Sequence, residues 1–213
     1  MKKSYITKRI EEGEHDQQDF KFAINDSRKI ARSLVAFANT KGGRLLIGVK
    51  DNGKIAGVRT DEEYHMIEAA AQLYCKPEIA FERRDWTIDK RKVLEIIIPE
   101  STNKPCLAQN NEGKWKAYVR IDDENVLANV VMLQVWKKQK STKGVKIKYS
   151  NAEKFLLSFL NQNKNISLNQ FYKQASISRY RAVNIIADLI VVGLLDFDFQ
   201  DNKFFYKLKN ENI

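Results

Sequence analysis

Three acidic residues near the start of the chain, Glu14, Asp19 and Asp51, could together hold a divalent metal ion. Hard cations such as Mg²⁺ and Mn²⁺ prefer oxygen ligands, and a bound ion can activate water for hydrolysis. The three positions are distant in sequence, so a metal site requires the fold to bring them together. Spacing alone favours a simpler interpretation, in which Glu14 lies in a surface loop and Asp51 belongs to the turn Asp51-Asn52-Gly53.

A second group of residues, all basic, could contact phosphates. Residues 137–149 contain six lysines and no acid, and they supply +6 of the net charge of +10. These lysines are Lys137, Lys138, Lys140, Lys143, Lys146 and Lys148. Such a block suits phosphate contact, although a solvated linker explains it equally well. Lys21, Lys41 and Arg44 could also bind phosphates, or could pair with neighbouring acids.

The third group lies at the start of a predicted helix, residues 179–192. Its core-facing stripe leaves five polar or aromatic side chains pointing outward: Ser178, Arg179, Tyr180, Arg181 and Asn184. Arginine and asparagine read guanine and adenine edges, and helix starts are where such contacts form. The alternative is a helix used for protein contacts. Acidic residues in the hairpin that follows favour that alternative, because a wing that grips DNA is usually basic.

The elements that must position these groups indicate an α+β fold with a mainly antiparallel sheet. Apolar residues at helical spacing predict a helix over 28–40, ended by Gly42-Gly43. A buried strand over 45–49, the turn at 51–53 and a second strand would follow as a hairpin. A strand is expected over 19–24, a helix from 60 to about 76, strand pairs over 78–99 and 105–119, and a helix over 127–138.

Residues 150–213 have a different pattern. Helices are predicted over 151–161, 168–175 and 179–192, followed by a hairpin of strands 195–199 and 204–208. Three helices and a hairpin are the order of a winged helix-turn-helix domain. The predicted organisation is therefore a first domain over 1–136, a lysine-rich linker over 137–149 and a small domain over 150–213.

Two segments, EHDQQDFKF and AFANTKGGRLLIGVKDNGKIAGV, resemble the Schlafen AlbA_2 domain, and the resemblance extends over roughly residues 8–137. It implies a DNA-binding domain of the kind found in bacterial regulators. In animal Schlafens the domain is associated with RNA cleavage that uses three acidic residues, which fall here on Glu14, Asp19 and the turn at Asp51. Two departures weaken this second implication. Asp19 replaces the more usual Glu, and Lys50 occupies a turn position that is often acidic, where its charge would repel a metal ion.

Other features of the sequence limit the functions that we expect. Gly42-Gly43 lacks the Gly-Lys-Ser/Thr that cradles phosphates, so ATP is not expected as a cofactor. Because the chain has no signal peptide and no apolar run of about 20 residues, and because Cys75 and Cys106 lie outside any ligand spacing, we expect a cytoplasmic protein with no membrane contact.

These observations favour a nucleic-acid-binding protein without enzymatic activity. The leading hypothesis is a homodimeric transcriptional regulator that binds DNA rather than RNA and needs no cofactor. The first alternative is an endoribonuclease that requires Mg²⁺ or Mn²⁺. The second is a protein-interaction or dimerisation module without nucleic-acid contact.

Overall fold

The chain divides after Ala128 into two units, each with its own hydrophobic core. The computed structural model describes residues 4–58, 60–142 and 144–209. The first unit is Met1–Ala128 and the second Asn129–Ile213. Helices combined with largely antiparallel strands confirm the predicted α+β class. Within the described ranges, no helix combines the length and apolar character needed to cross a bilayer.

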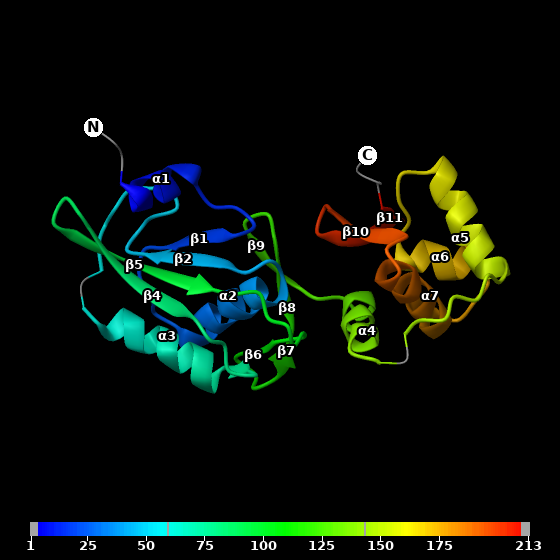
Figure 1. Cartoon of the computed structure of the whole chain (residues 1–213), viewed down its shortest axis with the longest axis horizontal. Helices are drawn as coiled ribbons and strands as arrows, with labels where there is room; N and C mark the ends of the chain where they lie inside the picture. The colour runs from blue at the N-terminus through cyan, green and yellow to red at the C-terminus, as the bar shows by residue number, and fades with distance from the viewer. Residues whose placement is uncertain (1–3, 59, 143, 210–213) are drawn as a thin grey trace. The chain divides into compact units, whose positions relative to one another are not determined.

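A four-stranded sheet of order β1-β2-β5-β4 organises the first unit (Figure 1). β1 (Gln18–Lys21) runs parallel to β2 (Gly43–Ile47), whereas β5 (Arg91–Ile98) is antiparallel to both β2 and β4 (Glu82–Ile88). Parallel neighbours need a crossover connection, and α2 (Ser27–Asn39) provides it. One strand pair of the sheet is therefore parallel, and the others follow the antiparallel arrangement that was predicted.

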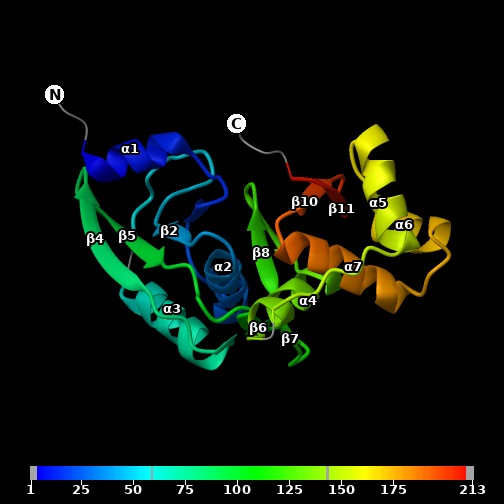
Figure 2. The same cartoon turned by 45° about the vertical axis from the view of Figure 1, so that its right-hand side comes forward.

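Helices cover both faces of this sheet, as Figure 1 and Figure 2 show. Successive side chains of a strand point to opposite faces. Leu45 and Ile47 of β2 therefore enter the core shared with α2 and α3 (Glu62–Leu73), while Leu46 packs in a smaller cluster with residues of α1 (Tyr5–Glu12). This arrangement buries Leu45, Leu46 and Ile47 of β2 from both sides, beside the parallel strand β1.

The connection from α2 to β2 depends on two glycines. Gly42 has a φ of +71° and its N–H donates to the Phe37 carbonyl at 3.0 Å, which closes the helix. A Cβ on Gly43 would lie 2.3 Å from a Phe37 ring carbon, so no larger residue fits there without displacing the ring. The helix end and the strand start can therefore be adjacent only because both residues are glycine.

The prediction of a hairpin across Asp51-Asn52-Gly53 is wrong in one respect. Val49 and Ile55 form a single isolated bridge, and no second strand follows. Gly48, at a φ of +89°, breaks the extended backbone directly after β2, and its carbonyl accepts the N–H groups of both Ala56 and Gly57. The turn is present, but the backbone after it folds back onto Gly48 and does not form a ladder.

Two small antiparallel sheets complete the first unit. β3 (Cys75–Lys76), β6 (Leu107–Gln109) and β7 (Trp115–Lys116) form one of them. β8 (Tyr118–Ile121) and β9 (Glu124–Leu127) form a hairpin whose turn is Asp122-Asp123. The sequence patterns did not predict β9, which lies between the predicted strand pair over 105–119 and the predicted helix over 127–138.

The second unit contains the predicted helices and hairpin. They are α5 (Asn151–Gln162), α6 (Leu168–Gln174), α7 (Arg179–Val191), β10 (Leu195–Gln200) and β11 (Lys203–Leu208). Serine side chains cap all three helices, and Gly193 follows α7 at a φ of +79°. The local sequence signals for this unit are strong, since each helix has both a cap and an apolar face.

One further helix, α4 (Val130–Gln139), belongs to the second unit and not to a domain ending at residue 136 as predicted. Val131 and Val135 are buried in the core that contains α5, α6 and α7. Gln134 donates to Asn184 on α7 at 2.9 Å. The predicted boundary therefore falls inside a helix, and the predicted linker starts with the last turn of that helix.

Candidate functional site

Glu14 and Asp19 lie side by side at the start of β1. Oε1 of Glu14 accepts the backbone N–H of Phe20 at 2.8 Å, which fixes the Glu14 carboxyl beside that of Asp19. Burial, together with its hydrogen bond to Asp19, raises the pKa of Glu14 to about 7, although the Phe20 N–H partly opposes the rise. Glu14 therefore keeps its proton to a higher pH than an exposed glutamate does.

Asp19 is buried, with an exposed fraction of 3%, and two cations hold it. Lys21 donates to its Oδ1 at 2.8 Å, and the Arg120 guanidinium lies 3.5 Å from the same atom. Oδ2 of Asp19 has no donor among the described residues. A proton on Glu14 would supply that donor, so the pair is best satisfied when it shares one proton.

Arg120 is the central cation of this region, and it was absent from the predicted site residues. Its Nη1 donates to Asn125 at 3.2 Å, and its Nη2 donates to the Gln18 carbonyl at 3.3 Å. The guanidinium also lies over the Phe37 ring, 5.2 Å from its centroid. β8 carries Arg120 across to β1 from about 100 residues away, so no local pattern of the sequence indicated this contact.

The three predicted metal ligands do not form a metal site. Asp51 lies exposed in the turn after β2, and no group of three or more potential ligands among the described residues is arranged to hold an ion. Asp19 already has Lys21 and Arg120 as counter-ions, and both would repel an added cation. The residues therefore do not fit the divalent ion that the family resemblance implied.

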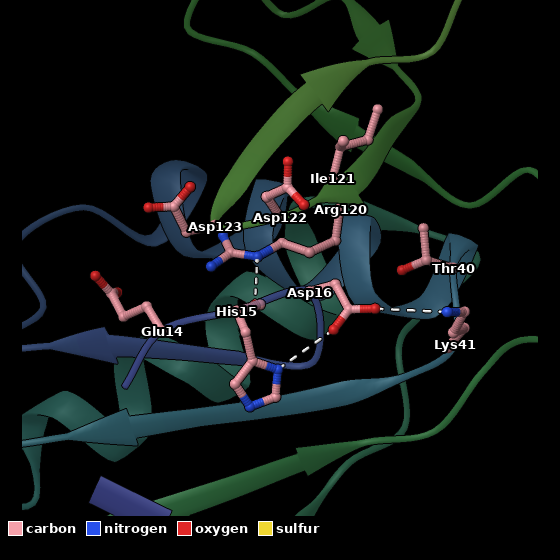
Figure 3. Close-up of a pocket in the computed structure, with 9 residues that line it drawn as sticks. All are labelled: Glu14, His15, Asp16, Thr40, Lys41, Arg120, Ile121, Asp122 and Asp123. Atoms are coloured by element: carbon pink, nitrogen blue, oxygen red, sulfur yellow. Dashed lines mark hydrogen bonds and ion pairs between the residues drawn. The ribbon is translucent and has the colours of Figure 1, made fainter. Parts of the chain in front are cut away.

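A cavity of about 470 Å³ opens beside this pair, and Figure 3 shows its lining. Glu14, Asp16, Asp122 and Asp123 contribute carboxyl groups, while Lys41 and Arg120 contribute the positive charges. Lys41 lies 3.5 Å from Asp16, and Arg120 also donates to the His15 carbonyl at 3.4 Å. The acids outnumber the cations, which disfavours a phosphate ligand here.

The basic residues predicted around β1 and β2 are already paired. Lys21 and Lys41 form the ion pairs described above. Arg44 lies 3.8 Å from the buried Glu95 and donates to the Tyr5 hydroxyl at 3.2 Å. Releasing Arg44 to a phosphate would take its cation from the buried Glu95, and releasing Lys21 would leave the buried Asp19 with the more distant Arg120. The exposed Lys41 is therefore available at the lowest cost.

Most of the described lysines in the lysine-rich segment, residues 137–149, form no ion pair with a described acidic residue. Lys138 pairs with Asp188 of α7 at 2.7 Å, so it supports the fold of the second unit. Lys137, Lys140, Lys146 and Lys148 are exposed and form no ion pair with a described residue. Lys143 lies outside the described residues.

The residues predicted at the start of α7 fall into two groups. Ser178 caps the helix by accepting the Arg181 N–H at 3.2 Å, and Asn184 is bound by Gln134 and donates to the Tyr180 carbonyl. Tyr180, in contrast, is 78% exposed, and Arg181 is exposed with one bond to Ser150. Arg179 lines a cavity of the second unit. Outward contacts are therefore available to Tyr180, Arg181 and Arg179, but not to Asn184.

Comparisons with solved structures give weak matches. The crystal structure of the DIP2311 protein from Corynebacterium diphtheriae is 15% identical over 69% of this chain and 34% of its own, with a TM-score of 0.45. The NMR structure of the N-terminal domain of a RecG-related protein from Nitrosomonas europaea is 20% identical over 56% of this chain and 89% of its own, also with a TM-score of 0.45. No curated protein matches the chain.

In contrast to these structural matches, the match to a family sequence profile identifies the family of this chain. The profile described as "Schlafen, AlbA_2" matches residues 14–129, which is more than half of the chain. The match begins at Glu14 and ends one residue beyond the first unit, so it contains both the carboxyl pair and Arg120. The chain therefore belongs to the Schlafen AlbA_2 family.

Proposed function

We propose that the protein binds double-stranded DNA as a transcriptional regulator, mainly through its second unit. The observation that carries this proposal is the group of four exposed lysines, Lys137, Lys140, Lys146 and Lys148, that have no ion pair within the described residues. Cations without protein partners are available to neutralise DNA phosphates, and this neutralisation releases the counter-ions condensed on the DNA. Membership of the Schlafen AlbA_2 family supports the same proposal, since the family resemblance implies nucleic-acid binding.

We assign recognition of the DNA base sequence to the start of α7. Three helices followed by a hairpin support a winged-helix architecture, in which this helix enters the major groove. Tyr180 and Arg181 are exposed there and can reach base edges. A homodimer in the cytoplasm that reads two half-sites fits this mode of binding.

The test is the salt dependence of binding, measured by fluorescence anisotropy with labelled duplex DNA, single-stranded RNA and tRNA. Each phosphate contact adds about −0.9 to the slope of log K against log salt on duplex DNA. Replacing Lys137, Lys140, Lys146 and Lys148 by glutamine should therefore flatten the slope by up to about 3.6. The matched control replaces four exposed lysines of the first unit, Lys54, Lys76, Lys90 and Lys116, and should leave the slope nearly unchanged.

Two results would contradict the proposal. One is the absence of binding to any of the three nucleic acids at low salt, which would favour a protein-interaction module. The other is an equal change of slope in both quadruple variants, which would show that net charge alone is being measured. A parallel incubation with Mn²⁺ tests the nuclease alternative, which requires RNA cleavage that is lost in Asp19→Asn.

A further inference from the structure

A second cavity, of about 700 Å³, lies in the second unit and is lined only by residues of that unit. Its lining comes from the start of α4, the start of α6, Arg179 at the start of α7, and Lys203 to Tyr206 on β11. Cavities of this size accommodate small organic molecules. Nothing in the proposed DNA contact uses this cavity.

The charged groups of this cavity are both positive. Arg179 and Lys203 line it, and its lining contains no carboxylate. The ion pairs of the described part of this unit join Lys138 to Asp188 and Lys207 to Asp198, so neither cavity cation is paired there. Two exposed cations without partners form a site that attracts an anion.

A buried hydroxyl adds a third donor. Tyr206 is 1% exposed, and its hydroxyl oxygen accepts a hydrogen bond from Asn129 at 3.3 Å. Burial raises the pKa of Tyr206 above its usual range, against smaller opposing effects of Asn129 and of the Arg179 charge, so the phenol keeps its proton. The hydroxyl forms no other hydrogen bond with a described residue, which leaves that proton available to a ligand oxygen.

The remaining wall is partly polar, from Asn129, Ser167 and Asn169, and partly apolar. Val130, Leu168, Phe204 and Phe205 line the same cavity, and Val130 is 38% exposed. A backbone phosphate of DNA would engage the cations but would leave this wall in water. A small molecule with a charged end and an apolar body satisfies both parts, since burying apolar surface adds to the affinity of the ion pair.

We propose that this cavity binds a small organic anion, whose carboxylate or phosphate lies between Arg179 and Lys203 and whose apolar or aromatic body packs against Leu168 and Phe204. The guanidinium of Arg179 can form two parallel hydrogen bonds to such a group. The Tyr206 hydroxyl donates to the same group. Tyr180 and Arg181, to which base contacts are assigned, do not line this cavity.

Isothermal titration of the full chain with naphthoate, naphthyl phosphate, neutral naphthamide and inorganic phosphate tests this proposal. We expect the two aromatic anions to bind, and naphthamide and inorganic phosphate to bind each at least about ten-fold more weakly. Comparison of naphthoate with naphthyl phosphate identifies the preferred acidic group. Equal affinity of naphthoate and naphthamide, or no binding of either aromatic anion at millimolar concentration, would overturn the proposal.

Variants locate the site. Arg179→Gln and Lys203→Gln, both on exposed residues, should each weaken binding of the preferred anion about ten-fold, and Tyr206→Phe should weaken it several-fold while keeping the buried ring. Arg181→Gln is the matched control, because it removes the same charge from the same helix turn outside the cavity. If Arg181→Gln reduced the affinity as much as Arg179→Gln, the cavity would not be the binding site.

Discussion

Replacing Glu14 with glutamine should stabilise the first unit above neutral pH and leave its stability at about pH 5 nearly unchanged. The pKa of Glu14 is raised from 4.5 to about 7 in the folded chain, chiefly by burial. Between these values the native state keeps a proton that the unfolded state has released. The free energy of unfolding therefore falls as the pH rises through this window, and the full penalty of the charged form is present above about pH 7.

The magnitude follows from the size of this rise. One pKa unit corresponds to about 1.4 kcal/mol, so the rise from 4.5 to about 7 sets an upper limit of about 3.5 kcal/mol. Glu14 is only partly buried, and solvent screening reduces this limit. We therefore expect Glu14→Gln to be more stable than the wild-type protein by about 1 to 2 kcal/mol at about pH 8. The glutamine amide can also donate to the unpartnered oxygen of Asp19.

Urea unfolding of both proteins at about pH 5 and about pH 8 measures this difference. Asp51→Asn is the control, because it removes one negative charge from an exposed turn. A Glu14→Gln variant that is less stable than wild type at about pH 8 would refute the proton-sharing pair. So would a stability difference between the two proteins that does not change with pH.

Three further substitutions test the supports of the site by the same unfolding measurement. Asn39→Ala removes three hydrogen bonds between a buried amide and the backbone, and should cost about 3 kcal/mol. Gly43→Ala places a methyl group 2.3 Å from the Phe37 ring and should cost about 1 to 3 kcal/mol, whereas a neutral result would show that the ring can move. Arg120→Met leaves Asp19 buried without its guanidinium and should cost about 3 to 5 kcal/mol; a smaller loss would mean that Lys21 suffices.

Sequence patterns predicted the elements whose signals are local. The Asp26 cap and Gly42 set the bounds of α2, and the serine caps with Gly193 set those of the second unit. The pattern also predicted the turn after β2. The pattern did not predict that Gly48 ends the extended backbone of β2 and so prevents the predicted hairpin. One glycine in an apolar run gives no indication of its φ.

The candidate site was less predictable, because long-range pairing decides it. Glu14 and Asp19, two members of the predicted metal site, lie beside each other, and only five positions separate them in the sequence. Asp51 was grouped with them as a third acidic residue at a predicted turn, and the family resemblance placed the same three residues together, but its turn remains exposed. The partners of Lys138 and Arg120 lie on other elements, so no local pattern could show that these charges were already neutralised.

The position of α4 determines where this protein can be divided. A fragment that begins at residue 150 keeps every helix that the sequence patterns assigned to the small domain, yet it loses Val131 and Val135 from the core and leaves Asp188 without Lys138. A fragment that begins at Asn129 keeps these contacts and also the Asn129 amide that binds Tyr206. The division that preserves these contacts is therefore at the peptide bond after Ala128, about twenty residues before residue 150, where the sequence patterns start the small domain.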